Sequence, residues 1–102
     1  MPELPEVEAV AERLRRAHLH HTITAYGQFR PTTMAGGENA IGHRITAIDR
    51  RGKNLLLRLD NGTFLRVHLK MTGNLTVIPD ARLRTSTIRA WFDLDDGRAD
   101  VD

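Results

Sequence analysis

The first seven residues carry the groups of this sequence that are best placed to do chemistry. Pro2 follows Met1, so removal of the methionine would leave a proline with a free secondary amine at the N-terminus. Glu3 and Glu6 place two carboxylates within four residues of that amine. A neutral amine beside acids can attack a carbonyl carbon and form a covalent intermediate. The alternative is an exposed terminus ahead of an ordinary helix, and residues 1–7 alone favour that alternative.

A helix is predicted directly after these residues, from Pro5 to about Leu19. Its apolar residues recur every three or four positions and form one stripe, made of Val7, Val10, Ala11, Leu14 and Ala17. Proline suits the first helical position because its missing N–H is not needed there. Acidic residues in the first turn and arginines in the last turn match the helix dipole at both ends. Burial of the stripe would fix the N-terminal amine against the core, which a catalytic amine needs.

Three histidines, His18, His20 and His21, stand at the end of this helix. Their close spacing suggests metal ligands, but no cysteine or well-spaced carboxylate beside them in the sequence completes a set. We therefore predict solvent-exposed histidines at the helix end and no metal site.

Most of the chain after the helix has the pattern of β-structure. Strands are predicted at 22–30, 44–50, 54–60, 63–69, 74–78, 87–94 and 98–102, with a loop at 31–38 and a short helical turn at 38–41. Asn61-Gly62 predicts a type I′ hairpin, in which both central residues need positive φ, and Asp96-Gly97 predicts a second hairpin turn. The predicted fold class is mainly β with an N-terminal α-helix, closed as an antiparallel two-sheet β-sandwich.

Composition places the 102 residues in one domain without disulfides, because the chain has no cysteine. The net charge of +2 is too small to indicate a nucleic-acid partner by itself, so the distribution of charge matters more. The basic residues gather in three clusters, which are Arg13 with Arg15 and Arg16, Arg50 with Arg51 and Lys53, and Arg82 with Arg84 and Arg89. No segment has membrane-spanning length or the order of a secretory signal. The expected location is the cytoplasm.

Three motifs together resemble the formamidopyrimidine-DNA glycosylase family. They are Pro2-Glu3-Leu4-Pro5-Glu6-Val7-Glu8, Arg50-Arg51-Gly52-Lys53 and His68-Leu69-Lys70-Met71-Thr72-Gly73. The related endonuclease VIII branch shares parts of this pattern. The resemblance spans residues 1–102 but covers only the N-terminal catalytic domain, and it implies the sandwich of that domain. The family's arginine-containing loop, helix–two-turn–helix domain and zinc finger would lie beyond Asp102, so we expect no metal or other cofactor within these residues.

The resemblance implies a bifunctional glycosylase and abasic-site lyase in the full-length protein, and it leaves open the activity of the isolated fragment. Family members remove oxidised purines, such as 8-oxoguanine and formamidopyrimidine, and cut the strand by β,δ-elimination. Pro2 matches the nucleophile, which forms a Schiff base with the sugar. Glu3 matches the general acid that protonates the sugar ring oxygen. Glu6 matches a supporting carboxylate, with helix capping as its alternative role.

The resemblance also assigns contacts with DNA. Lys53 matches a catalytic lysine that binds phosphate beside the lesion, a contact that positions the duplex without reading its sequence. Met71 matches the side chain that fills the gap left by the extruded base, with core filling as its alternative role. The family commonly has histidines where this chain has residues 85–89. Thr87 and Arg89 could donate to phosphate in their place.

The partner implied by the resemblance is damaged double-stranded DNA, bound by a monomer at the bacterial nucleoid, with no membrane involved. Three alternatives stay open. The first is a non-catalytic, DNA-binding or structural domain of the same fold, and the second is an endonuclease VIII-like glycosylase for oxidised pyrimidines. The third is an N-terminal-proline enzyme of the tautomerase type, which is disfavoured because there the proline opens a β-strand.

Overall fold

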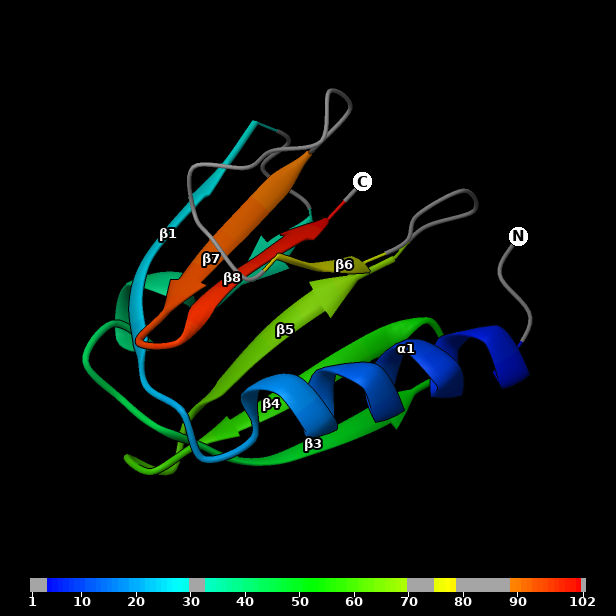
Figure 1. Cartoon of the computed structure of the whole chain (residues 1–102), viewed down its shortest axis with the longest axis horizontal. Helices are drawn as coiled ribbons and strands as arrows, with labels where there is room; N and C mark the ends of the chain where they lie inside the picture. The colour runs from blue at the N-terminus through cyan, green and yellow to red at the C-terminus, as the bar shows by residue number, and fades with distance from the viewer. Residues whose placement is uncertain (1–3, 30–32, 70–74, 79–88, 102) are drawn as a thin grey trace.

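One α-helix, one 3-10 helix and eight β-strands form the fold in this computed structural model, which describes residues 4–29, 33–69, 75–78 and 89–101. In chain order they are α1 (Leu4–His18), β1 (Ile23–Gln28), β2 (Met34–Ala35), η1 (Gly37–Asn39), β3 (Ile45–Arg51), β4 (Asn54–Leu59), β5 (Phe64–His68), β6 (Leu75–Ile78), β7 (Ala90–Leu94) and β8 (Gly97–Val101). The strands make two antiparallel sheets, β1-β7-β8-β6 and β2-β5-β4-β3 (Figure 1). The predicted two-sheet fold with an N-terminal helix is confirmed.

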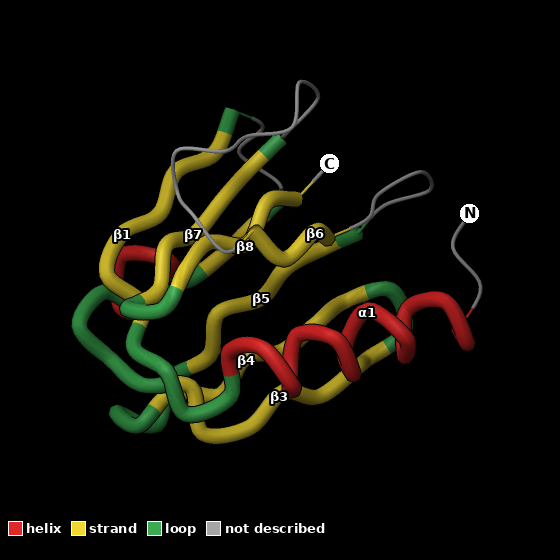
Figure 2. Tube along the Cα trace, in the orientation of Figure 1, coloured by secondary structure: helices red, strands yellow, loops and turns green. Residues whose placement is uncertain are grey.

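Helix α1 begins and ends one residue before its predicted limits. The apolar stripe is the buried face, because Val7, Val10, Ala11 and Leu14 each have at most 5% of their surface exposed. The helix runs alongside β3 and also contacts β6, so it touches one strand of each sheet (Figure 2). Within the described ranges, no helix is long and apolar enough to cross a membrane.

Two arginines of α1 tie the helix to both sheets through backbone carbonyls. Arg15 Nε donates to the carbonyl of Ile48 in β3 at 2.8 Å. Arg13 Nη2 donates to the carbonyl of Leu75 in β6 at 3.2 Å. The apolar stripe alone would allow the helix to slide along the sheets. Each guanidinium opposes this by a directional hydrogen bond to one strand. The position of the helix axis is therefore set from two sides.

The hairpin between β4 and β5 differs from the predicted type I′ turn. Of the described residues other than glycine, only His20 has positive φ, so Asn61 does not adopt the required conformation. Leu59 N–H donates to Thr63 O at 2.9 Å across a three-residue loop, and Gly62 alone is left-handed, with φ of 84°. Asn61 Oδ1 accepts hydrogen bonds from Thr63 N–H and Oγ1 at 3.1 and 2.7 Å. These bonds stabilise a three-residue loop that ends in a left-handed glycine. The prediction of a two-residue type I′ turn was therefore wrong.

Strand β2 falls within the segment predicted to be a loop. Met34 and Ala35 pair with Val67 and Arg66 of β5, and the 3-10 helix η1 begins one residue before the predicted helical turn. A strand of two residues cannot be recognised from the sequence, because the alternation of apolar and polar residues shows only over four or more residues.

Strand β7 lies within the predicted strand 87–94, and buried side chains alternate along it with half-buried ones. Ala90, Phe92 and Leu94 are buried in the core between the sheets. The following hairpin turn is one residue earlier than predicted, because Leu94 pairs with Gly97 and leaves Asp95 and Asp96 at the turn. That shift places two adjacent carboxylates at the tip of the hairpin.

Gly36 gives a direct test of the packing between β2 and β5. Its φ is 88°, and a Cβ built there would collide with the backbone carbonyl oxygen of Phe64. We expect Gly36→Ala to lower the free energy of unfolding by roughly 2–5 kcal/mol, the sum of a left-handed alanine and local overpacking. Gly42→Ala is the matched control, because its φ is 86° but no atom lies within 4 Å of the added Cβ. Urea denaturation of both variants measures the difference, and equal losses would contradict the collision.

Candidate active site

The described parts of the segments that carry the three sequence motifs lie at one end of the molecule. The start of α1, the turn between β3 and β4, the end of β5 and the start of β6 all lie at this end (Figure 1). Lys53 occupies the turn between β3 and β4, next to Gly52, whose φ of 59° suits a tight reversal of the chain. The fold therefore carries the predicted phosphate-binding lysine to the end where α1 begins.

Leu69 connects two of the predicted site residues. Its backbone N–H donates to the carbonyl of Lys53 at 3.1 Å, and its own carbonyl accepts from Arg89 Nη2, also at 3.1 Å. The Leu69 side chain is 1% exposed, so the peptide is anchored in the core. The N–H and the carbonyl of the buried Leu69 are thus both hydrogen-bonded, one to Lys53 and the other to Arg89.

Arg89 is held by its main chain as well as by its side chain. Its N–H donates to Val101 O at 2.6 Å, and its carbonyl accepts from Phe29 N–H at 2.7 Å. These bonds extend the pairing of β7 with β8 and β1 by one residue. A guanidinium has five N–H donors, so the bond to Leu69 leaves others for a ligand.

The structure describes only part of the remaining predicted site residues. Pro2, Glu3, Met71 and Thr87 lie outside the described residues, and their assigned roles stay predictions. Glu6 lies in the first turn of α1, but its side chain is outside what the structure describes. The structure thus links Lys53 and Arg89 through Leu69 and leaves the predicted nucleophile and acid untested.

A charged network fixes α1 next to the turn that carries Lys53. Glu8 accepts hydrogen bonds from Arg15 Nη1 at 3.0 Å and from Arg50 Nε of β3 at 3.3 Å. The bond from Arg15 lowers the pKa of the Glu8 carboxyl, which desolvation opposes, and Arg50 adds to the lowering. Arg15 also contacts Glu12. Arg50 is therefore occupied in holding the helix, whereas no acidic residue of the described segments pairs with Lys53.

The roles of Leu69 and Arg15 in holding these segments together were not predicted from the sequence. Leu69 acts through its backbone, and no side-chain pattern signals such a role. Arg15 was interpreted as a partner of the helix dipole and as part of a basic cluster, and its bond to the Ile48 carbonyl of β3 was not predicted. A signal existed for Arg15, because it lies next to the apolar stripe at the position following Leu14.

The prediction of solvent-exposed histidines was wrong for His18. His18 is 2% exposed, and its Nδ1 lies 3.1 Å from Asp96 Oδ1. His21 contacts carboxylates of the β7–β8 turn. His20 is exposed as predicted, and the His21 side chain keeps 40% of its surface exposed. The carboxylates that were missing beside the histidines in sequence come from the far end of the chain, where sequence spacing could not reveal them.

The Lys53 end of the molecule carries several basic side chains. Lys53 lies in the turn between β3 and β4, Arg51 is an exposed neighbour, and Arg89 is anchored to Leu69 from the opposite sheet. Clustered cations of this kind can contact the phosphates of a nucleic-acid backbone.

Comparison with known proteins shows the family to which the chain belongs. Residues 1–100 match the family model described as formamidopyrimidine-DNA glycosylase N-terminal domain. The formamidopyrimidine-DNA glycosylase of Chloroflexus aggregans is 43% identical over 104 residues, which is 96% of this chain and 38% of that protein. The enzyme of the same name from Thermus thermophilus is 40% identical over 88 residues, covering 86% of this chain and 33% of its own length.

Solved structures give the same result for the fold. The crystal structure of the MutM (Fpg) protein of Thermus thermophilus superposes with a TM-score of 0.82 at 36% identity, over 98% of this chain and 36% of that chain. The Lactococcus lactis Fpg in complex with DNA containing a formamidopyrimidine lesion superposes with a TM-score of 0.82 at 26% identity, over 97% of this chain and 39% of that one. The chain spans well under half the length of these relatives. It belongs to the family of formamidopyrimidine-DNA glycosylase N-terminal domains.

Proposed function

We propose that the chain is the catalytic domain of a base-excision DNA glycosylase and abasic-site lyase that removes oxidised purines. The observation that carries the proposal is the junction at Leu69, which joins Lys53 and Arg89 at the end where α1 begins. Structures of a Lactococcus lactis relative with DNA containing a formamidopyrimidine lesion or an abasic site support DNA as the partner. The curated relatives are bacterial proteins, and we place the action of this chain in the bacterial cytoplasm, as a monomer.

The proposed reaction starts with the amine of Pro2 after Met1 is removed. An α-amine has a pKa of roughly 8, so a useful fraction is neutral at cellular pH and can attack C1′ of the sugar. The C1′–base bond breaks as the amine bonds to C1′, and the departing base takes up the proton that the amine releases. Glu3 then donates a proton to the ring oxygen as the sugar opens to an iminium. The iminium acidifies the C2′ hydrogens, so loss of a proton expels the 3′ phosphate. A second elimination expels the 5′ phosphate, and hydrolysis of the iminium frees the amine.

In this scheme the other residues position the duplex. Lys53 holds a phosphate next to the damaged nucleotide, and Arg89 supplies a second donor from the opposite sheet. Met71 fills the space from which the base is extruded, because an apolar side chain replaces the lost stacking. Glu6 assists proton transfer near the amine.

Borohydride trapping tests the covalent step. The Met1-processed chain is incubated at low salt with an oligonucleotide duplex containing an abasic site, and borohydride reduces the iminium to a stable cross-link. The proposal expects a cross-linked band of the summed mass, and mass spectrometry of the digested adduct should locate it on Pro2. Duplexes with 8-oxoguanine and with an oxidised pyrimidine then compare lesion preference. Absence of any cross-link, at concentrations where DNA is bound, would refute the lyase assignment.

The phosphate contact of Lys53 predicts a specific change in the salt dependence of DNA binding. We expect Lys53→Gln to make the slope of log K against log salt concentration shallower by about 1, because one fewer counterion is released. Arg44→Gln is the control, since Arg44 directly precedes β3 and Lys53 follows it, at the opposite end of the strand. Fluorescence anisotropy over a series of salt concentrations measures both slopes. An equal change in the two variants would show that Lys53 contributes only to general charge.

A further inference from the structure

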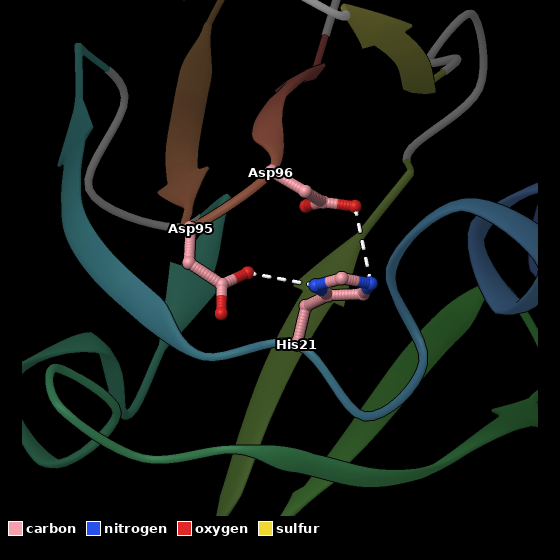
Figure 3. Close-up of side chains that lie close together, drawn as sticks. All are labelled: His21, Asp95 and Asp96. Atoms are coloured by element: carbon pink, nitrogen blue, oxygen red, sulfur yellow. Dashed lines mark hydrogen bonds and ion pairs between the residues drawn. The ribbon is translucent and has the colours of Figure 1, made fainter.

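The exit of α1 and the tip of the β7–β8 hairpin together form a histidine–carboxylate cluster, remote in sequence from the motifs of the candidate active site. The His21 ring lies between two carboxylates (Figure 3). Nδ1 is 2.8 Å from Asp95 Oδ1, and Nε2 is 3.3 Å from Asp96 Oδ2. The ligand atoms that the three residues can offer all lie within 4.8 Å of one another. One imidazole and two carboxylates thus converge from segments at opposite ends of the chain.

We propose that His21, Asp95 and Asp96 bind a divalent transition-metal ion, with Zn²⁺ as the ion that this donor set favours. Zinc is commonly bound by imidazole nitrogen and carboxylate oxygen at about 2.0–2.2 Å. Ligand atoms around a tetrahedral ion are then roughly 3.3 Å apart, so the ligand atoms of the cluster, which lie within 4.8 Å of one another, have to move only a short way to surround the ion. Among divalent ions available in cells, zinc also binds such nitrogen-containing sites more strongly than manganese or iron.

Binding requires one rearrangement, which the exposure of the side chains permits. Only one nitrogen of the His21 ring can face the ion, so one of the two carboxylates must turn toward the other. The side chain of Asp95 is 50% exposed, and its carboxylate is free to rotate into place. The half-exposed position of the cluster leaves room for water as the remaining ligand.

His18 provides an independent observation in favour of a built site. Its ring is 2% exposed, and Nδ1 lies 3.1 Å from Asp96 Oδ1, the carboxylate oxygen that does not face His21. A buried group that fixes the second oxygen of a ligating carboxylate is the usual support of a protein metal site. His18 therefore orients Asp96 and leaves its Oδ2 directed at the cluster.

The chain also contains a natural comparison for this cluster. His43 Nδ1 lies 2.8 Å from Asp60 Oδ1, the same distance as between His21 and Asp95. Both histidines are about equally exposed, at 39% and 40%. In the described segments the His43 pair belongs to no group of three such ligands. A single histidine–aspartate pair is an ordinary surface ion pair, so only the His21 cluster is expected to hold the ion.

Titration calorimetry with ZnCl₂ on the untagged 102-residue chain tests the proposal. We expect one ion per chain, with binding weakened at least tenfold in Asp95→Asn and in His21→Gln, and unchanged in Asp60→Asn. Co²⁺ should show the visible absorption of a low-coordinate site in the wild type and in Asp60→Asn only. His21→Gln can still donate to a carboxylate, so it remains informative if Asp95→Asn unfolds. No saturable binding, or equal affinity in wild type and both cluster variants, would overturn the proposal.

Discussion

A chain with any residue retained ahead of Pro2 is expected to lose its borohydride-trapped cross-link to abasic DNA by about 10³-fold or more. A retained residue turns the proline nitrogen into an amide, whose lone pair is delocalised into the carbonyl and cannot attack C1′. The chain holds two lysines, Lys53 and Lys70, so the N-terminus is one of only three sites for an amine nucleophile. Trapping yields are compared for the processed chain and for a chain with an uncleaved N-terminal extension, each verified by intact mass.

The matched controls separate loss of chemistry from loss of fold or binding. Both chains should unfold at the same temperature, and their DNA affinities should agree within a few-fold. Equal trapping by the two chains would contradict the prediction and would direct attention to Lys53 and Lys70. Lys53→Arg and Lys70→Arg would then identify the reacting amine, because a guanidinium keeps the charge and forms no Schiff base.

Phe92→Ala is expected to reduce the free energy of unfolding by about 3–5 kcal/mol. Phe92 has 0% of its surface exposed in the core and lies on β7, between Tyr26 of β1 and Ala99 of β8. Removing the ring leaves a cavity between the two sheets, and the loss is a large part of the 5–15 kcal/mol that typically stabilises a domain. Urea denaturation should show a midpoint lowered by more than about 1 M.

Phe29→Ala is the matched control for Phe92. Phe29 directly follows β1 and is 64% exposed, so its truncation should change stability by no more than about 0.5 kcal/mol. The same ring is removed in both variants, so any difference comes from burial. Similar losses for the two would contradict the burial of Phe92 that the structure describes.

The parts of the fold that the sequence predicted are those governed by local periodicity. The stripe from Val7 to Leu14 defines α1, and the alternation at Ala90, Phe92 and Leu94 defines β7, because each buried face repeats along the element itself. Strand β2 was missed because two residues cannot show a period. Its strand character comes from pairing with Val67 and Arg66 of β5, which are distant in sequence.

In the candidate site, too, a residue marked by a local motif was predicted, and features that depend on contacts distant in sequence were not. Lys53 was predicted because a motif marks its turn, and the fold brings the turn between β3 and β4 to the end where α1 begins. The junction at Leu69 could not be predicted, because backbone groups carry no sequence signal. The burial of His18 was missed for a related reason. Its partner Asp96 is 78 residues away in the chain, and the hairpin that presents it is one residue out of the predicted register.

The two sheets differ in how far along the chain their neighbours lie. Strands β3, β4 and β5 follow one another through short turns, whereas Ile23 at the start of β1 pairs with Leu94 at the end of β7. During synthesis, β1 therefore leaves the ribosome long before its partner exists. Closing so long a segment carries a larger entropic cost and slows pairing. We therefore expect the β3–β5 meander to form first and to offer α1 a surface before the sheet that holds Arg89 closes.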